Sequence, residues 1–447
     1  MMKKIKYSLA GILLLLCTFQ ASAQKPDMIS DSLSIQNISK ARSYRLLFED
    51  DFNRPGKPDA GHWLYRHNAK MGGISWSGNL EQKKAADGSA NHALHINFTY
   101  EPKSREGEQY RGGGIVSVHN FGYGYYEAKV KLYGGEPGLS GLHQSFWSMG
   151  LTGTNEAEGK GVRDSLVALD IIPEENRVLE IDGFEQDSKG SSLGLNYHIY
   201  SPTHKSKAPA PNRITKDLSK WIVMAYEWLP DRINFYSDGK FIATKMLEGP
   251  WKLYAPQNLW LTALPVNLPA WGGLKVPGRD VSMQVDYFKF YAKDLAGINR
   301  IGNADFEYGA SGNTYPIAWI TARTSGNNQQ AGKVATDQPG AQSGLRYLIH
   351  QSAKDYKAVT RQLLEYIPNG VYNFSAWVKS SGGQKQAAIV IRTGKSERVI
   401  AVKANREWTR VALQDVKVMN NQAFIEICSD AKGGQWLMAD NFEFTQQ

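Results

Sequence analysis

Apolar and polar residues alternate with a period of two along much of the chain, whereas helical periodicity is scarce. The alternation is clearest in "GYGYYEAKVKLYGG" (122–135), "INFYSDGKFIATKM" (233–246) and "VDYFKFYAKD" (285–294). Residues that favour turns separate these runs, and Asp238-Gly239 has the composition of a two-residue hairpin turn. Many short strands joined by long turns predict an all-β protein built from sandwiches.

A domain boundary is predicted near residue 300. The segment 285–294 is typical of the last strand of a domain, and the Gly- and Asn-rich sequence after it indicates the beginning of another domain. We therefore expect one domain at residues 24–294 and a second, smaller β-sandwich at residues 301–447. No internal repeat relates them and no long low-complexity linker separates them, so we expect the two domains to pack together.

The N-terminus has the features of a secretory signal peptide at residues 1–23. Three lysines in the first six residues precede the apolar run Leu9–Leu16, and Ala21–Ala23 supplies small residues before a cleavage site. The apolar run is too short to span a bilayer comfortably, so we expect no membrane span. These features predict a secreted or periplasmic protein, and the lack of an internal disulfide, described below, favours a bacterial source.

Composition narrows the function classes. The 447 residues are 42% hydrophobic and 11% aromatic, with 12 Trp and 22 Tyr, which suits β-rich folds and stacking on sugar rings. The formal net charge of +9 falls to +6 without the three signal lysines, which is compatible with an anionic polysaccharide. The sequence has no dense run of basic residues of the kind that favours nucleic-acid binding. Its nine His residues form no HExxH spacing, which argues against a metal-dependent hydrolase.

Without the signal peptide, Cys428 is the only cysteine, so the mature chain forms no internal disulfide. It alternates with Ile425 and Ile427 in "FIEICSD", and no His lies nearby in sequence. We interpret it as a buried structural residue rather than a nucleophile.

The candidate chemistry lies in "VLEIDGFEQDS" (178–188), where three carboxylates interrupt an apolar run. On a strand, Glu180 and Asp182 share one face while Leu179 and Ile181 share the other. Glu185 would face the wrong side of a regular strand, but a one-residue bulge at Gly183 would return it. The pattern predicts a strand that directs three acids into one cleft. The alternative is an ordinary solvated outer face.

The first domain resembles glycoside hydrolase family 16, whose signature is a bulged Glu-x-Asp-x-x-Glu strand. Residues 180–185 match that signature. Further matches, in order and spacing, cover nearly the whole domain: "LLFEDDFNRPG" (46–56), "WSGNLEQ" (76–82), "FGYGYYEAKVKL" (121–132) and "VDYFKFY" (285–291).

The resemblance implies a concanavalin-like β-jelly roll with a glycan cleft, and retaining hydrolysis of internal β-linkages in a polysaccharide. It assigns Glu180 as nucleophile, Glu185 as general acid/base and Asp182 as the helper between them. Retention requires two carboxyl groups about 5 to 5.5 Å apart, one ionised and one protonated at working pH. Their environments must therefore separate the two pKa values.

The resemblance also suggests residues that contact the substrate, each with a structural role as the alternative. They are Trp76, Asn79, Glu81, Trp147, His198 and Trp271. It implies no catalytic cofactor, and it places Asp286 at a position that binds a structural calcium in many relatives. One carboxylate cannot define a calcium site, which needs six or more oxygen ligands.

One departure bears on the substrate. Glucan-cleaving members often have Trp-Pro-Ala-Phe-Trp where this chain has His143-Gln144-Ser145-Phe146-Trp147. The expected polymer is therefore a β-galactan or a β-1,3-type glucan. A non-catalytic glycan-binding protein on the same fold, or a transglycosylase, remains the alternative, and the sequence predicts no oligomeric state.

The second domain resembles a carbohydrate-binding module, through "NADFEYG" (303–309), "YNFSAWVKSSGG" (372–383) and "WLMADNFEF" (436–444). Alternation places Tyr372 and Phe374 on the core face and Trp377 among polar neighbours on the other. An exposed Trp377 suits sugar stacking, and packing against the first domain is the equal alternative.

Overall fold

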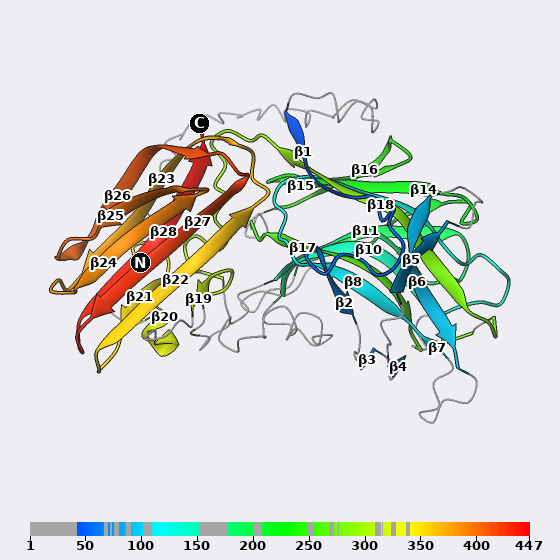
Figure 1. Ribbon diagram of the computed structural model, residues 1–447, viewed down its shortest axis with the longest axis horizontal. Helices are drawn as coiled ribbons and strands as arrows, with labels where there is room; N and C mark the ends of the chain where they lie inside the picture. Colours follow the sequence, from blue (N-terminus) through cyan, green and yellow to red (C-terminus); the bar gives the residue numbers. More distant parts are fainter. Residues whose placement is uncertain are drawn as a thin grey trace, which may run out of the picture.

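The structure is a computed structural model, and Figure 1 gives the strand labels used below. It describes residues 43–66, 70–71, 74–75, 80–85, 91–101, 110–151, 177–199, 208–248, 254–267, 272–275, 277–308, 314, 316–322, 328–336 and 340–447. The predicted signal peptide at residues 1–23 lies outside these ranges.

Residues 44–293 form two antiparallel sheets. In sheet A the main order is β16 (Lys240–Met246), β15 (Arg232–Ser237), β14 (Ile222–Trp228), β9 (Gly124–Lys131), β18 (Val281–Lys293), β6 (His92–Tyr100) and β5 (Leu80–Lys84), with β1 (Tyr44–Asp50) on β18 and β7 (Tyr110–Arg111) on β6. Sheet B has the order β13 (Asn212–Thr215), β12 (Ser192–Ile199), β11 (Arg177–Gln186), β10 (Leu142–Leu151), β17 (Gln257–Pro265), β8 (Gly113–Ser117) and β2 (Trp63–Arg66). A separate small pair joins β3 (Lys70–Met71) to β4 (Ile74–Ser75).

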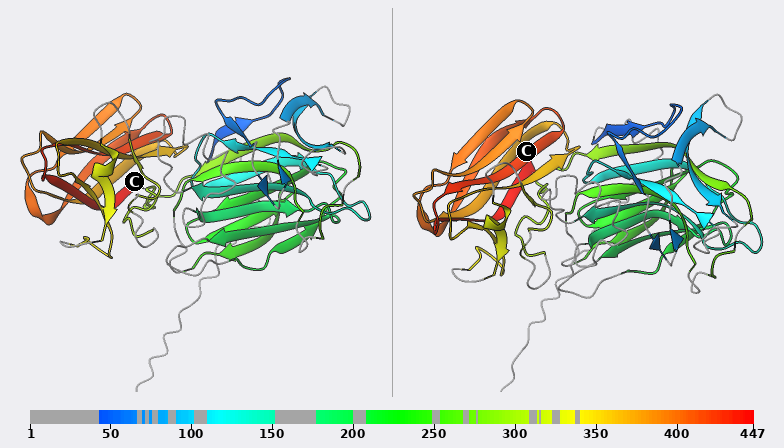
Figure 2. Two further views of the ribbon diagram at one scale, coloured as in Figure 1. Left: turned by 90° about the horizontal axis from the view of Figure 1, so that it is seen from below. Right: turned by 60° about the horizontal axis from the view of Figure 1, so that its bottom comes forward.

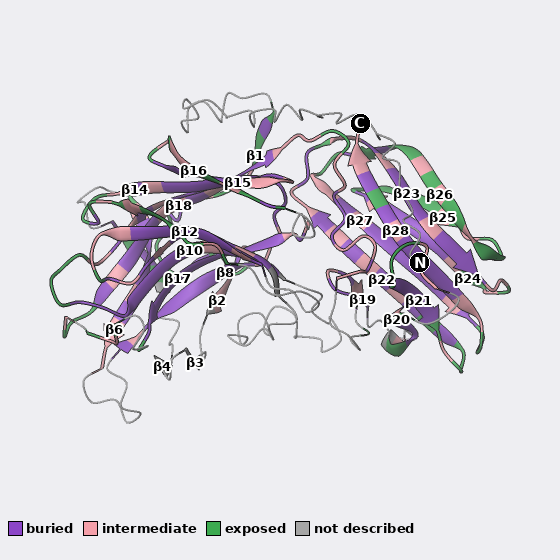
Figure 3. Cartoon of the chain, turned by 180° about the vertical axis from the view of Figure 1, so that it is seen from behind, coloured by how far each residue is buried: buried purple, intermediate pink, exposed green. Residues whose placement is uncertain are grey.

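The core lies between sheets A and B because each sheet turns its apolar side chains toward the other. Ile181 and Phe184 of β11 are fully buried in one hydrophobic cluster with residues of sheet A. The ring of Phe146 on β10 lies 5.4 Å from that of Tyr226 and 6.2 Å from that of Phe288. Figure 3 shows the two layers side-on with their mainly buried strands, and Figure 2 shows the sheets from two further directions. Period-two alternation therefore leaves the other face of sheet B for polar side chains.

Two smaller sheets form a second sandwich. Sheet C has the order β19 (Ile320–Thr321), β22 (Tyr356–Glu365), β27 (Gln422–Ala431), β24 (Gln386–Thr393) and β25 (Ser396–Ala401). Sheet D has the order β20 (Gly332–Ala335), β21 (Tyr347–Gln351), β28 (Trp436–Gln446), β23 (Gly370–Ser380) and β26 (Asn405–Val418). Tyr372 and Phe374 lie in its core, as the alternation predicts. The one helical element assigned in the described residues is a 3-10 turn, η5 (Gln329–Ala331).

The two sandwiches lie side by side (Figure 1), and side chains of each contact the other. The carboxylate of Glu365, at the end of β22, lies 3.2 Å from Nδ1 of His119 and accepts a hydrogen bond of 3.1 Å from the backbone amide of Asn120. The ring of Tyr366 lies 5.0 Å from that of Phe121 and 5.7 Å from that of Phe48. The ring of Tyr366 thus packs the second sandwich against the hydrophobic core of the first.

These observations confirm the predicted fold class, an all-β jelly-roll sandwich followed by a smaller β-sandwich. Asp238 and Gly239, with φ of 50° and 73°, form the predicted two-residue turn between β15 and β16. Cys428 is buried on β27, and burial raises the pKa of its thiol to about 11. In the described part of the chain, no helix is long and apolar enough to cross a membrane.

Candidate active site

Strand β11 carries the three acids, and it contains the predicted bulge. Against β10, Asp182 pairs with Trp147 and Phe184 with Phe146, so Gly183 is the extra residue. Against β12 the register also shifts between Asp182 and Glu185. The bulge therefore returns Glu185 to the face that carries Glu180 and Asp182.

Gly183 is required at the bulge because the backbone there lies against the core. A Cβ atom at this position would lie 2.7 Å from Cδ1 of Phe146 and 2.9 Å from Cδ1 of Tyr226. Contacts this short force neighbouring atoms to move, and both neighbours are fully buried aromatic rings. Core packing and the placement of the acids thus depend on the same glycine.

The acids differ in exposure. Asp182 is buried, with its side chain 2% exposed, whereas the side chain of Glu185 is 39% exposed. Glu180 is half-buried and lies directly opposite His198 on β12. Nε2 of His198 lies 3.3 Å from Oδ2 of Asp182. The strand neighbouring β11 thus supplies an imidazole in contact with the central acid.

Burial raises the pKa of Asp182 well above its usual value, and the negative charge of Glu185 raises it further. A hydrogen bond with Glu180 opposes these two effects but does not cancel them. Asp182 therefore favours its protonated form, in which its hydroxyl can donate a hydrogen bond to the Glu180 carboxylate. An ionised Glu180 is the state that a nucleophile needs.

The pKa of Glu185 shifts the other way. Burial raises it, but the hydrogen bond and the charge of His143, followed by the charges of His198 and Arg213, lower it to below its usual value. Nε2 of His143 lies 3.3 Å from Oε1 of Glu185. The acid with a raised pKa is Asp182, and Glu185 is held as a carboxylate. The environments do separate the pKa values of the site, although the protonated group is not the one assigned to proton donation.

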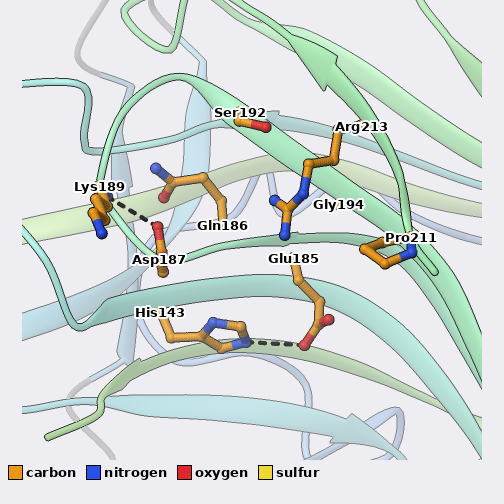
Figure 4. A pocket seen from close by; sticks show the side chains of 9 residues that line it. All are labelled: His143, Glu185, Gln186, Asp187, Lys189, Ser192, Gly194, Pro211 and Arg213. Atoms are coloured by element: carbon orange, nitrogen blue, oxygen red, sulfur yellow. Dashed lines mark hydrogen bonds and ion pairs between the residues drawn. The ribbon is translucent and has the colours of Figure 1, made fainter. Parts of the chain in front are cut away.

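A pocket of about 290 Å³ opens beside Glu185 (Figure 4). Its walls come from β10, β11, β12, the turn after β11 and the segment that leads into β13. The lining residues are His143, Glu185, Gln186, Asp187, Lys189, Ser192, Gly194, Pro211 and Arg213. The pocket is polar, and it gives Glu185 access to a ligand outside the sheet.

Trp147 lies on β10 on the face of the acids, directly opposite Asp182. It is half-buried, its ring stacks on that of Trp260 at 4.7 Å, and its Nε1 donates a 3.2 Å hydrogen bond to Thr262. These contacts fix the indole in place on the outer face of sheet B. Trp147 is therefore positioned beside the acids, as a residue that contacts substrate would be.

Other predicted residues lie apart from this group. Glu81 lies on β5, at the edge of sheet A, where it is exposed and pairs with Lys83 at 2.6 Å. Trp377 lies on β23 of the second sandwich, where it is half-buried opposite Arg410. Trp76, Asn79 and Trp271 lie outside the described residues.

Asp286, the predicted calcium ligand, has a lysine as its neighbour, which does not suit calcium binding. The carboxylate of Asp286 pairs with Nζ of Lys129 at 2.7 Å, and calcium needs several oxygen ligands instead of an ammonium group. Within the described ranges, one group of three could hold a metal ion: ligand atoms of Glu180, Asp182 and His198 lie within 4.8 Å of one another. Asp286 is not part of it, and the calcium site stays a prediction without a ligand cluster.

Sequence reasoning did not select His143, Lys189 and Arg213 as site residues. His143 was recognisable in principle, because it alternates with Ser145 and Trp147 on the same strand face. Arg213 lies in the four-residue edge strand β13, and Lys189 lies in a turn. Neither position has a sequence pattern that points to the acids.

The fold and site together define an all-β sandwich with a bulged acidic strand beside an open polar pocket. No protein-family model matches the chain. A curated relative, the keratan-sulfate endo-1,4-β-galactosidase of Sphingobacterium multivorum, is 23% identical over 419 residues, covering 88% of this chain and 87% of the relative.

Solved structures match parts of the chain at low similarity. A non-specific endo-β-1,3(4)-glucanase of family GH16 is 20% identical and covers 57% of this chain and 96% of its own, with a TM-score of 0.42. TmCBM61 in complex with β-1,4-galactotriose is 22% identical and covers 34% of this chain and 100% of its own, with a TM-score of 0.29.

Proposed function

We propose that this protein is a retaining endo-β-glycanase that hydrolyses internal β-galactosidic bonds of a polysaccharide. The observation that carries the proposal is the bulged strand β11, which gathers Glu180, Asp182 and Glu185 on one sheet face beside a pocket. The named activity of the relative that matches 88% of the chain supports galactose over glucose as the sugar attacked.

In the first step of the proposed mechanism, the carboxylate of Glu180 attacks the anomeric carbon. The bond from that carbon to the leaving oxygen breaks, and Glu185 gives the leaving oxygen a proton. In the second step Glu185 takes a proton from water, whose oxygen attacks the anomeric carbon and releases Glu180. Asp182, protonated, holds Glu180 by a hydrogen bond and stabilises its negative charge before attack.

Proton donation requires Glu185 to gain a proton after substrate binds, because its pKa in the free protein lies below the usual value. A bound polysaccharide removes water from a side chain that is 39% exposed. Loss of water disfavours the charged carboxylate and raises its pKa. Substrate binding therefore prepares the acid, while His143 keeps it charged in the free protein.

The residues around the acids support a galactan substrate. His143 and Gln144 replace the Trp-Pro pair of glucan-cleaving members, and His143 contacts Glu185 directly. We propose that the second sandwich binds the same polysaccharide through Trp377. We also propose that the signal peptide directs the protein out of the cytoplasm.

The test is release of reducing ends from β-galactans, keratan chains and β-1,3-glucans by wild type and by Glu180→Gln. We expect wild type to produce oligosaccharides from a β-galactan or a keratan chain. We expect Glu180→Gln to lose more than about a thousandfold in rate, because the nucleophile is absent. Glu248→Gln, an exposed glutamate of the same sandwich, is the matched control and should retain full activity.

The alternatives give different results. A transglycosylase would produce longer chains along with the shorter ones, which product sizing detects. A glycan-binding protein would release nothing from any polymer while wild type is still retained by one of them. That second result would contradict the hydrolase proposal.

A further inference from the structure

An arginine reaches the candidate acid across the sheet. Glu185 on β11, Gly194 on β12 and Arg213 on β13 lie in register on three adjacent strands. Gly194 has no side chain, and a Cβ atom there would lie 3.9 Å from an amino nitrogen of Arg213. The guanidinium therefore lies over β12 and extends toward Glu185 (Figure 4).

A second cation lies on the same pocket. Lys189, in the turn after β11, is exposed and lines the pocket on the side away from Arg213 (Figure 4). Its Nζ lies 3.8 Å from the position of a Cβ atom on Gly272, so the side chain extends toward that loop. The pocket is thus lined by a guanidinium on one side and by the lysine side chain on the other (Figure 4).

The acids of the pocket make their direct polar contacts with other groups, although the charge of Arg213 also acts on Glu185. Asp187 accepts a 3.0 Å hydrogen bond from the backbone amide of Lys189, and Glu185 contacts His143 at 3.3 Å. In the parts of the chain that the structure describes, neither the ammonium of Lys189 nor the guanidinium of Arg213 forms an ion pair. Within those residues no direct ion pair neutralises either cation, so both can bind an anionic group of a ligand.

We propose that this pocket is a subsite for a sulfate ester on a sugar next to the scissile bond. The inference rests on the proposed function and names the substrate class of that site. A sulfate ester carries a negative charge at any working pH, and two of its tetrahedrally arranged oxygens can accept hydrogen bonds from the paired N–H groups of an arginine. Because Arg213 is in register with Glu185, the sulfated sugar would lie beside the bond that Glu185 protonates.

The test is direct binding, which does not depend on turnover. Glu180→Gln, prepared as the full chain, is titrated with keratan sulfate oligosaccharides and with the same preparation after chemical desulfation. A desolvated ion pair is expected to give the sulfated form an advantage of about tenfold in Kd. Adding Arg213→Gln or Lys189→Gln should reduce that ratio to about twofold, and raising the salt concentration should reduce it as well.

Lys240→Gln, an exposed lysine in a hairpin of sheet A, is the matched control and should leave the ratio unchanged. Equal affinity for the two preparations, or a ratio that Arg213→Gln does not alter, would overturn the sulfate subsite. Binding of neither preparation would overturn it too. Failure of wild type to release reducing ends from either preparation would contradict the hydrolase proposal alone, because the ratio of affinities is measured on a variant without activity.

Discussion

At the scale of single residues, His143 controls the charge state of Glu185. Its hydrogen bond and charge oppose the effect of burial and hold the pKa of Glu185 below the usual value. We expect His143→Ala to raise this pKa, because both lowering effects are lost. The basic limb of the kcat/KM profile, which reports the acid of the free enzyme, should move to higher pH.

His143→Gln is the matched variant, since it keeps a hydrogen-bond donor without the charge. Its basic limb should lie between those of wild type and His143→Ala. A limb that stays in place, or that moves to lower pH in His143→Ala, would show that His143 does not set the pKa of Glu185.

Burial of Asp182 at the same site lowers the stability of the folded protein at neutral pH. The pKa of Asp182 is raised in the folded protein. Its contribution to the free energy of unfolding is therefore fully present below its pKa in the unfolded chain, about 3.8, and is lost as the pH rises through its pKa in the folded protein. We expect Asp182→Asn to increase the free energy of unfolding near pH 7 and to lower activity. Denaturant unfolding at pH 4 and pH 7 checks this, and a variant less stable than wild type at pH 7 would contradict it.

The sequence was sufficient for some of these residues and insufficient for others. Period-two alternation predicted that Glu180 and Asp182 share a face, and the structure confirms it. The opposite pKa shifts of Asp182 and Glu185 depend on burial and on His143, which is 42 positions from Glu185 in the chain. No local pattern encodes such a contact, because strand pairing alone brings the two residues together.

At the scale of elements, the bulge of β11 is the feature on which the site depends. We expect Gly183→Ala to destabilise the protein by about 1–3 kcal/mol, because its Cβ atom would collide with buried rings of Phe146 and Tyr226. The collision should also displace Glu185 relative to Asp182 and reduce activity. Thermal unfolding and reducing-end release measure the two effects.

Gly194→Ala is the matched control, since its new Cβ atom would make only ordinary contacts of 3.8 Å or more. We expect its change in stability to be below about 0.5 kcal/mol. Equal effects at the two glycines would contradict the packing argument.

The bulge was predictable because a glycine stands between two acids whose spacing is odd. The strand neighbours were only partly predictable. The loop-rich sequence gave no register for β13, so the alignment of Glu185, Gly194 and Arg213 became visible only once three strands were placed side by side.

At the scale of the whole molecule, the two sandwiches are joined by a contact in which Glu365 lies beside the packed rings of Tyr366 and Phe121. We expect Glu365→Ala to weaken it, because His119 and the amide of Asn120 lose their acceptor. Two separate transitions should then replace a merged one in calorimetry, with the lower midpoint falling by several degrees.

Glu397→Ala, which removes a surface pair with Arg392 far from this contact, is the control and should change little. An unchanged unfolding profile for Glu365→Ala would show that the contact does not couple the sandwiches. The sequence predicted that the two domains pack together, but the contact residues themselves come from segments more than 200 positions apart.

The central claim is that Glu180 attacks the sugar and is replaced by water in a second displacement. The most direct test is proton NMR of the first product formed from the polymer that wild type cleaves, recorded before mutarotation. The account predicts that the new reducing end appears first in the β configuration and only later equilibrates. A reducing end that appears first in the α configuration would contradict it, because a single displacement by water inverts the anomeric carbon.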